Sequence, residues 1–452
     1  MSMNIQSVEK IEILPSNQPN NNTYSFRGGN PIISLQIPAQ AKYLKPSSLR
    51  INGTFKIKGQ NGVAPNEQQL PDNNDLKGGG ASAIHLSSRV GVNACFQNVV
   101  LVSAASNQSL ESIRNYGRLV SSLLSSTHSS QDMATEKSCT AVMSGLDSSS
   151  SNMCNNATRF SVPLYAGLLQ GTGPIPLSAN GVNGLQINLE LCSDQQLLSG
   201  AQASNTLGAF YELSDVSLTC DLLVPDLQGV QELSASGSGA FSYHSWSSLY
   251  SVINSSDATQ TYNLANSQVL SVLHNFIPVS HTNNYAQDGF STGALRNSTG
   301  GVYDTDAVLK RVSFSRGGAR LGLDYEMDSS VQSKSGIPEA QVLLNYLSAF
   351  QSVGRMLNSR QLMGYGGNPL RADRPQNKVK NRSKGINADA KRNFGIGLNL
   401  DPISETGVNF RGQSYSTRIV SSLDGNSPNA IHTHLLSTNV LTYSPSGIMI
   451  QS

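Results

Sequence analysis

The sequence is poor in charged residues. Only 13% of its 452 residues are Asp, Glu, Lys or Arg, against roughly a quarter in an average soluble protein. The net charge of +2 excludes the strongly basic surface of a chain that binds nucleic acid along its whole length. Uncharged polar residues and glycine supply the polarity instead, and such a surface costs less free energy to cover with a neighbouring subunit than a charged one.

Cysteine is scarce and has no recognisable pattern. The five cysteines are Cys95, Cys139, Cys154, Cys192 and Cys220. Their number is odd and no two of them have the CxxC spacing of a metal or redox site, so we predict mostly reduced residues. A bridge between Cys139 and Cys154, which share one polar loop, stays an open alternative.

Segments for secretion or membrane insertion are missing from the sequence. The first ten residues, MSMNIQSVEK, lack the apolar centre of a signal peptide. No apolar run approaches the roughly 20 residues of a membrane-spanning helix. We therefore expect the chain to fold in a cytosol-like compartment and not to be secreted by a signal peptide.

Motifs of catalysis and cofactor binding are also missing. The sequence has no Gly-x-Ser-x-Gly elbow and no HExxH frame. The glycine runs 78–80 and 317–318 lack the Lys-Ser/Thr of a phosphate loop. We therefore expect no catalytic, cofactor-binding or metal-binding residues, no cofactor and no enzyme, although a catalytic triad assembled only by folding is not excluded.

Two histidines have a spacing that would suit a shared metal ion. His432 and His434 are two residues apart on a predicted strand, so their side chains share a face, as metal ligands must. No third ligand stands at a recognisable spacing, and we interpret both as structural. The single tryptophan, Trp246, is predicted to lie in the core.

Short strands separated by sharp turns dominate what is present. In residues 159–222, Phe160, Val162 and Leu164 alternate with polar or small neighbours, and the segment 185–191 (LQINLEL) alternates strictly. Between them, Gly-Pro-Ile-Pro at 173–176 breaks the chain. Closely spaced strands with turn signals are typical of a sandwich or barrel.

The two halves of the chain repeat one order of elements. Each has strands, one predicted helix (109–126 and 338–362), a long polar loop (126–157 and 363–390) and more strands, and they close with LSDVSLT and LSTNVLT. A period of half the chain predicts two tandem copies of one domain. We expect a loosely ordered amino-terminal arm (1–29), a first domain (30–223), a linker (224–239) and a second domain (240–452).

One basic cluster interrupts the otherwise weak charge pattern. Only two acidic residues accompany it. We interpret the cluster as a solvated loop or as a contact with an acidic neighbouring subunit, and contact with nucleic acid through its phosphates is the alternative. No aromatic residues are interleaved for base stacking. Its members are Arg371, Arg374, Lys378, Lys380, Arg382, Lys384, Lys391 and Arg392.

Four stretches of the sequence carry a family resemblance: 92–116, 159–191 with its F-x-x-P-L and (I/L)-P-L patterns, 338–354 and 393–423. Together they resemble the double jelly-roll major capsid proteins of icosahedral double-stranded DNA viruses, especially those of polinton-like viruses and virophages, with adenovirus hexon more distant. The resemblance covers nearly the whole chain, although these motifs are loose, and the chain is short for the eukaryotic members of the family.

This resemblance implies an all-β chain with two inserted helices, folded as two tandem eight-stranded jelly rolls. It also implies a structural protein of the virion, a homotrimer that forms pseudo-hexagonal capsomers with neighbouring capsomers, penton and cement proteins as partners. We then expect synthesis in the host cytosol or nucleus, and contacts through the loops 59–82, 126–157, 285–303 and 363–390. A glycan- or host-binding fibre or adhesin and a carbohydrate hydrolase on a β-sandwich stay as alternatives.

Overall fold

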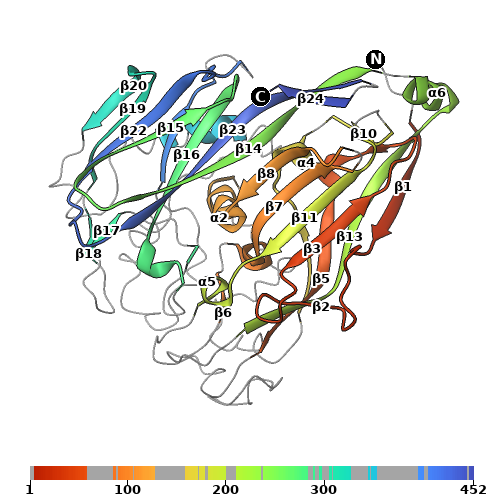
Figure 1. Cartoon of the computed structure of the whole chain (residues 1–452), viewed down its shortest axis with the longest axis horizontal. Coiled ribbons are helices and arrows are strands. Elements are labelled where there is room, and N and C mark those ends of the chain that lie inside the picture. Colours follow the sequence, from red (N-terminus) through yellow and green to blue (C-terminus); the bar gives the residue numbers. More distant parts are fainter. Residues whose placement is uncertain are drawn as a thin grey trace.

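Two β-sandwiches lie side by side in the structure (Figure 1). The strands coloured red to yellow form the right-hand sandwich, and most green and blue strands form the left-hand one. The computed structural model describes residues 5–58, 85–87, 90–104, 106–127, 158–171, 173–178, 182–199, 210–235, 238–283, 289–290, 295–297, 305–307, 309–326, 345–346, 348–353, 395–401, 406–444 and 447–451.

The first sandwich is built from the first half of the chain. Its long strands are β1 (Ile5–Ile13), β3 (Ile32–Ile37), β5 (Arg50–Lys58), β7 (Phe96–Ser103), β8 (Ser109–Arg114), β9 (Thr158–Pro163), β11 (Leu185–Leu191) and β13 (Phe210–Pro225). Its short strands are β2 (Thr23–Tyr24), β4 (Tyr43–Leu44), β6 (His85–Leu86), β10 (Ile175–Pro176) and β12 (Leu198–Ser199). One antiparallel sheet has the order β1-β13-β5-β9, and the facing one has the order β3-β11-β7-β8.

The second sandwich is built from the second half. Its long strands are β14 (Gly239–Ile253), β15 (Asp257–Leu264), β16 (Val269–Pro278), β19 (Leu309–Arg316), β20 (Ala319–Glu326), β21 (Gly395–Asn399), β22 (Gln413–Ser421) and β23 (Asn429–Ser444). The remaining strands are β17 (Arg296–Asn297), β18 (Thr305–Asp306) and β24 (Gly447–Gln451), which pairs with β23. The two sheets have the orders β14-β23-β16-β21 and β15-β22-β19-β20.

Both sandwiches have the same connectivity. When the long described strands of each are numbered along the chain, strands 1, 8, 3 and 6 form one sheet and strands 2, 7, 4 and 5 form the other. This is the double-sheet jelly-roll arrangement, in which eight strands wind as two Greek keys. The similar closing segments LSDVSLT and LSTNVLT lie in β13 and β23, the last long strand of each sandwich, so the predicted tandem repetition is confirmed.

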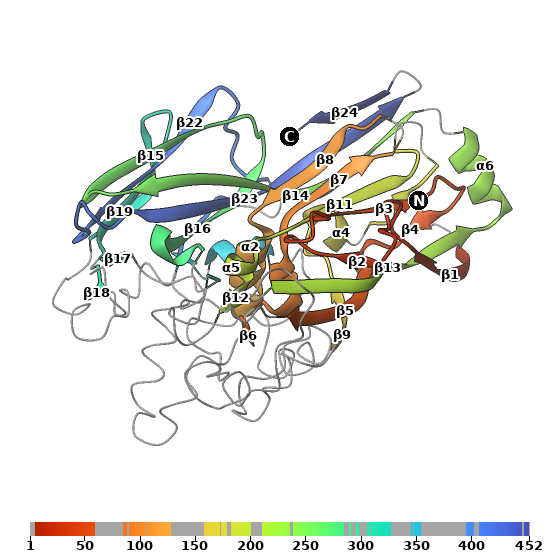
Figure 2. The same cartoon turned by 60° about the horizontal axis from the view of Figure 1, so that its bottom comes forward.

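One sheet runs through both sandwiches. Ser247 of β14 pairs in parallel with Ser112 of β8, which joins the β3-β11-β7-β8 sheet to the β14-β23-β16-β21 sheet. Figure 2 shows β14 and β23 extending from the second sandwich toward β8 and β7 of the first. Backbone pairing therefore sets how the two sandwiches sit against each other.

The predicted amino-terminal arm is wrong in its first half. Residues 5–13 form β1, which pairs with β13 from Ile5↔Pro225 to Ile13↔Leu218. Ile11 and Ile13 pack against the core. β13 is 16 residues long, and β1 pairs with its second half on the edge opposite to β5. The weakly patterned segment 5–13 therefore becomes a strand because β13 supplies its hydrogen-bonding partner.

Few of the described residues are helical, and one helix is shorter than the sequence predicts. The segment 109–126 is a strand up to Arg114, turns at Asn115 with φ 54°, and becomes helical only from Tyr116. The predicted helix 338–362 is helical where it is described, at 345–346 and 348–353, and its other residues lie outside the described part. The helices whose bounds are described are α2 (Tyr116–Thr127), α4 (Gly167–Gln170), α5 (Asp194–Leu197) and α6 (Leu227–Ala235), with 3-10 turns η1 (Pro46–Ser48), η2 (Gly91–Cys95) and η4 (Val279–His281).

The predicted linker 224–239 is largely structured. β13 continues to Pro225, α6 fills most of the segment, and β14 begins at Gly239.

Among the described helices, none is long and apolar enough to cross a membrane.

The larger core extends across the junction. Its cluster contains the interior of the first sandwich together with Trp246, Leu273 and Leu436 of the second. A smaller cluster around Phe314 and Ile419 fills the second sandwich. Trp246 is 1% exposed, as the sequence predicts, and it lies where the two sandwiches meet.

Candidate functional site

A buried carboxylate ties the two sandwiches together. Glu111 of β8 is 4% exposed. It accepts hydrogen bonds from the backbone amides of Gly167 and Leu168 in α4, at 2.9 and 3.0 Å, and from that of Trp246 in β14, at 2.7 Å. Hydrogen bonds to a carboxylate are stronger than neutral ones, so one side chain fixes β8, α4 and β14 at a single point.

A β-bulge places Glu111 in the interior. Leu101 of β7 faces Glu111, but the next residue, Val102, faces Ser109, so Leu110 is extra in β8. The bulge lets the consecutive residues Leu110 and Glu111 both be buried. Burial raises the pKa of Glu111 to about 7, although the three amides act in the opposite direction.

Two tyrosines add further bonds around this carboxylate. The Tyr116 hydroxyl accepts a hydrogen bond from the Tyr165 amide at 2.8 Å, and the Tyr243 hydroxyl donates one to the Leu110 carbonyl at 2.9 Å. The second bond again joins β14 to β8. Burial raises the pKa of both tyrosines, so both hydroxyls keep their protons at neutral pH.

The backbones of α4 and β14 approach too closely for any side chain between them. A Cβ atom on Gly167 would lie 2.5 Å from the His244 carbonyl oxygen and 2.9 Å from the Ser245 Cα. These are backbone atoms, which cannot move aside as a flexible side chain can. The junction is therefore a rigid contact set by a glycine, a carboxylate and the sheet that both sandwiches share.

The two histidines singled out by their spacing do share one face of β23. His432 and His434 are 3% and 1% exposed. His434 Nδ1 lies 3.2 Å from the Ser248 hydroxyl, and the His432 ring lies 5.2 Å from the Tyr250 ring. Among the described residues, no group of three or more His, Cys, Asp or Glu side chains could hold a metal ion.

The structure describes three of the five cysteines and none of the basic cluster. Cys95, Cys192 and Cys220 are free and buried, as predicted for reduced cysteines. Cys139 and Cys154 lie outside the described residues, and so does the basic cluster from Arg371 to Arg392.

Exposed apolar side chains occur on both sandwiches. The first-sandwich patch comprises Val8, Leu14 and Ile32, which are 59%, 61% and 51% exposed. The second-sandwich patch comprises Tyr250, Val252 and Val279, at 54%, 42% and 37%. Val8 and Ile32 lie on β1 and β3 of the first sandwich, Tyr250 and Val252 lie on β14, and Val279 begins η4 after β16. Exposed apolar surface can mark contact sites.

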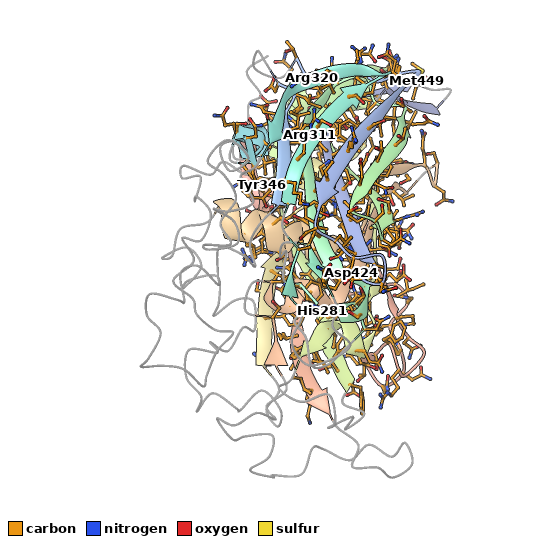
Figure 3. All side chains as sticks on the ribbon, turned by 90° about the vertical axis from the view of Figure 1, so that its left-hand side faces the viewer. His281, Arg311, Arg320, Tyr346, Asp424 and Met449 are labelled. Carbon is orange, nitrogen blue, oxygen red and sulfur yellow. The ribbon has the colours of Figure 1, made fainter. Side chains whose placement is uncertain are left out.

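The outer face of the β15-β22-β19-β20 sheet is polar by contrast. Arg418 pairs with both carboxylate oxygens of Asp257, and Thr261 hydrogen-bonds Ser416. Figure 3 views this sandwich from its outer side, with Arg311 and Arg320 toward one end and His281 and Asp424 toward the other. This sheet therefore differs in chemistry from the two apolar patches.

The sheet edges of the first sandwich are protected. Ser16 donates its amide to the Ser34 carbonyl, and the Asn17 side chain binds both Ile32 and Ser34, which covers the outer edge of β3. The outer edge of β1 has no strand partner among the described residues, and it includes Glu9, Lys10 and Glu12. Charges on an edge strand limit uncontrolled pairing with other chains.

Glu111 was not identified from the sequence. The sequence predicts a helix over 109–126 without assigning a role to Glu111, because a bulged strand and an amphipathic helix give similar patterns over six residues. A single acidic residue between Leu110 and Ile113 was the available signal, but one sequence does not distinguish it from an exposed charge.

The sequence itself matches no protein-family model and none of the curated proteins. Its structure is nevertheless similar to solved capsid structures over its whole length. It matches the capsid of the virus PBCV-1 with a TM-score of 0.59 at 13% identity, over 100% of this chain and 98% of that one. The PBCV-1 capsid protein fitted into a reconstruction of the virophage Sputnik gives 0.60 at 14% identity, with the same coverage.

A third similar structure is the major capsid protein of Faustovirus. Its TM-score is 0.61 at 10% identity, over 97% of this chain and 90% of that one. These neighbours are double jelly-roll proteins, and the likeness over nearly complete chains shows that this chain has the double jelly-roll fold.

Proposed function

We propose that this chain is the major capsid protein of an icosahedral virus with a double-stranded DNA genome. In this proposal three copies form a pseudo-hexagonal capsomer, and capsomers tile the shell. The observation that carries it is the full-length match to three capsid structures together with two jelly rolls of identical connectivity in one chain. Three such chains bring six similar sandwiches around one axis, which suits hexagonal packing.

The exposed patches support a ring of this kind. The first-sandwich and second-sandwich patches differ in composition and lie in opposite halves of the chain. A head-to-tail contact between two different surfaces closes into a ring when the rotation between copies allows it. In the proposed trimer, the first-sandwich patch of one copy contacts the second-sandwich patch of the next.

The junction supports a building block of fixed shape. Capsomer geometry depends on a constant angle between the two sandwiches, and the shared sheet, the Glu111 hydrogen bonds and Gly167 each restrict that angle. The low charge of the chain suits surfaces that neighbouring copies cover.

Several finer points belong to the same proposal. The domain division becomes a first roll that begins at β1 instead of residue 30, α6 as the connection, and a second roll that begins at β14.

Penton and cement proteins are the other partners of the chain, and the basic residues Arg371 to Lys384 contact an acidic neighbour or nucleic acid. The role is structural and not enzymatic, with synthesis in the host cytosol or nucleus and a final location in the virion.

The four long polar segments of the sequence have equivalent places in the two rolls. They follow the third and the fifth long strand of each: β5 and β8 in the first roll, β16 and β20 in the second. These segments lie largely outside the described residues, and in this proposal they make the contacts between capsomers or with the exterior.

Size-exclusion chromatography with light scattering tests the proposal. The expected mass is that of three 48.1 kDa chains, with larger shells at high concentration. A monomer that binds glycans would support the fibre or adhesin alternative. Hydrolysis of a carbohydrate that is lost when one acidic residue is mutated would support the hydrolase alternative. Either result would refute the capsid proposal.

A further inference from the structure

Strand β15 is the edge strand of one sheet of the second sandwich. It pairs with β22 from Asp257↔Val420 to Leu264↔Gln413, without a bulge. Among the described residues, no strand pairs with its other side. Its sheet lies on the side of the second sandwich away from the first (Figure 1), and the hydrogen bonds of the junction involve none of its residues. We call this unpaired side the β15 edge.

The equivalent edge of the first sandwich is closed by its own chain. β3 and β15 are each the second long strand of their sandwich. Residues 14–22 follow β1, and within them Ser16 and Asn17 form hydrogen bonds with the backbone of β3. In the second sandwich, only residues 254–256 lie between β14 and β15. The connection that covers the edge of β3 therefore has no counterpart between these two strands.

The pairing with β22 shows which backbone groups of β15 point toward the open edge. The Ser421 amide donates to the Ser256 carbonyl at 2.7 Å, and hydrogen-bonded pairs recur at every second residue of an antiparallel ladder. The even-numbered residues of β15 therefore bond β22, and the odd-numbered ones direct their amides and carbonyls outward. The outward carbonyl of Asp257 accepts a hydrogen bond from the Ser255 hydroxyl at 2.8 Å. Those of the other odd-numbered residues have no backbone partner among the described residues.

The β15 edge lacks the features that usually prevent strand pairing. Charges along the strand, proline and bulges protect edge strands, and the edge of β1 has such charges. β15 reads DATQTYNL, so its single charge is at one end, where Asp257 is bound by Arg418. An uncharged, regular edge of this length is a template for another strand.

We propose that the β15 edge pairs antiparallel with the β15 edge of a second copy, across a two-fold axis at Gln260, and that this contact joins neighbouring capsomers. The second part rests on the proposed function. A two-fold contact uses the same surface of both copies, so it does not close a ring of three. It is therefore separate from the head-to-tail contact within the trimer.

The outward backbone groups determine the position of the axis. With the axis at Gln260, Thr259 of one copy faces Thr261 of the other, and Asp257 faces Asn263. All odd-numbered residues of both strands then form hydrogen-bonded pairs, whereas an axis moved in either direction leaves at least one of them unpaired. No like charges face each other, and facing threonines stabilise a strand pair. The edge is therefore complementary to itself.

The contact is small, because each strand has eight residues and stable interfaces bury roughly 1,200 Å² or more. Pairing between two isolated chains should therefore be weak. A trimer presents three copies of the edge, so several weak contacts act together when capsomers meet. The β15 edge is thus expected to stabilise assemblies larger than the trimer and not dimers of single chains.

Cysteine cross-linking of the full chain tests the register. At a non-hydrogen-bonded antiparallel pair, the two Cα atoms lie about 4.5 Å apart, which a disulfide can span. Gln260→Cys should therefore link two copies through position 260 under mild oxidation with glutathione disulfide, and mass spectrometry of the digested product distinguishes this link from links through native cysteines.

Asn263→Cys is the matched control. Asn263 is more exposed than Gln260, but in the proposed register its two copies are about 20 Å apart, so it should not link to itself. Equal linkage at both positions, or linkage at neither under conditions where species larger than the trimer form, would overturn the proposal.

A proline variant tests what the edge does in assembly. The Thr261 amide points away from β22, so Thr261→Pro removes a donor of the edge without breaking a hydrogen bond within the chain. We expect this variant to keep its thermal midpoint and its trimer and to lose the larger species in light scattering. Thr261→Val keeps the amide and should keep those species. Larger species from Thr261→Pro equal to those of the original chain would contradict the contact.

The capsid role and the β15 contact fail in different ways. A chain that does not reach the mass of a trimer refutes the capsid role, whereas linkage through position 260 still reports on the β15 edge. Trimers whose larger species form without this link refute only the β15 contact. If Thr261→Pro lowers the thermal midpoint, the comparison of Gln260→Cys with Asn263→Cys decides.

Discussion

Glu111 is the side chain on which the junction depends most. Replacing it by leucine keeps the approximate volume but leaves the amides of Gly167, Leu168 and Trp246 without an acceptor. A buried donor left unsatisfied costs roughly 1–3 kcal/mol, so we expect Glu111→Leu to lower the free energy of unfolding by about 3–5 kcal/mol. Denaturant unfolding followed by Trp246 fluorescence measures this, since Trp246 is the only tryptophan.

The matched control is Glu190→Leu. Glu190 is exposed, and its carboxylate accepts a hydrogen bond from the Asn98 side chain on a solvated sheet face. We expect its effect to stay within about 1 kcal/mol. Equal losses in the two variants would show that the Glu111 hydrogen bonds do not stabilise the junction.

Gly167 provides a second test of the junction at the scale of one residue. In Gly167→Ala the new methyl group would meet the His244 carbonyl at 2.5 Å, and we expect a loss of roughly 2–3 kcal/mol from overpacking. Gly173→Ala is the control, because a Cβ there meets nothing within 4 Å. Thermal unfolding compares them, and a neutral Gly167→Ala would mean that α4 and β14 can separate without cost.

At the scale of residues, the sequence predicted what depends on local pattern and missed what depends on contacts. Burial of Trp246 and the shared face of His432 and His434 were predicted and are confirmed. The role of Glu111 was missed, because its partners are on α4 and β14, which are distant in the sequence. Only the folded chain brings these groups together.

β1 shows how an element gains its structure from its partner. Deletion of residues 1–13 removes β1 and exposes the edge of β13 from Leu218 to Pro225. We expect the thermal midpoint to fall by several degrees and aggregation to increase, since unpaired strand edges template association. Deletion of residues 1–4 alone is the control, and an unchanged midpoint after the longer deletion would restore the interpretation of β1 as a loose arm.

The second-sandwich patch is the element-scale test of assembly. Tyr250→Asp/Val252→Asp puts charges on side chains that are 54% and 42% exposed, so the chain should fold but lose the trimer in light scattering. Thr259→Asp/Thr261→Asp is the control on the polar outer face of β15, and it should leave the trimer unchanged. A trimer that survives the first pair would remove this patch from the interface.

At the scale of elements, the sequence predicted strands well where apolar residues alternate strictly, as in 185–191. It failed at 109–115, where Leu110 and Ile113 fit both a helix and a strand, and pairing with β7 decides the outcome. It also failed at β1, whose partner lies about two hundred residues further along the chain. Pairing partners are long-range information that local periodicity does not contain.

The whole molecule is a pair of jelly rolls with identical connectivity, joined by one continuous sheet. The repeated order of elements was sufficient to predict two copies, because tandem repetition is visible as similar segments such as LSDVSLT and LSTNVLT. The join between the copies was not predictable, since it depends on contacts between segments distant in the sequence, such as the pairing of Ser112 with Ser247 and the Glu111 hydrogen bonds. That join gives the molecule the constant shape that the proposed capsomer requires.

Electron microscopy of the purified chain is the most direct test of the proposed function. The account predicts particles with three-fold symmetry and a pseudo-hexagonal outline, in which each copy contributes two adjacent sandwiches. Single chains or two-fold dimers at the concentrations where the fold is stable would contradict it.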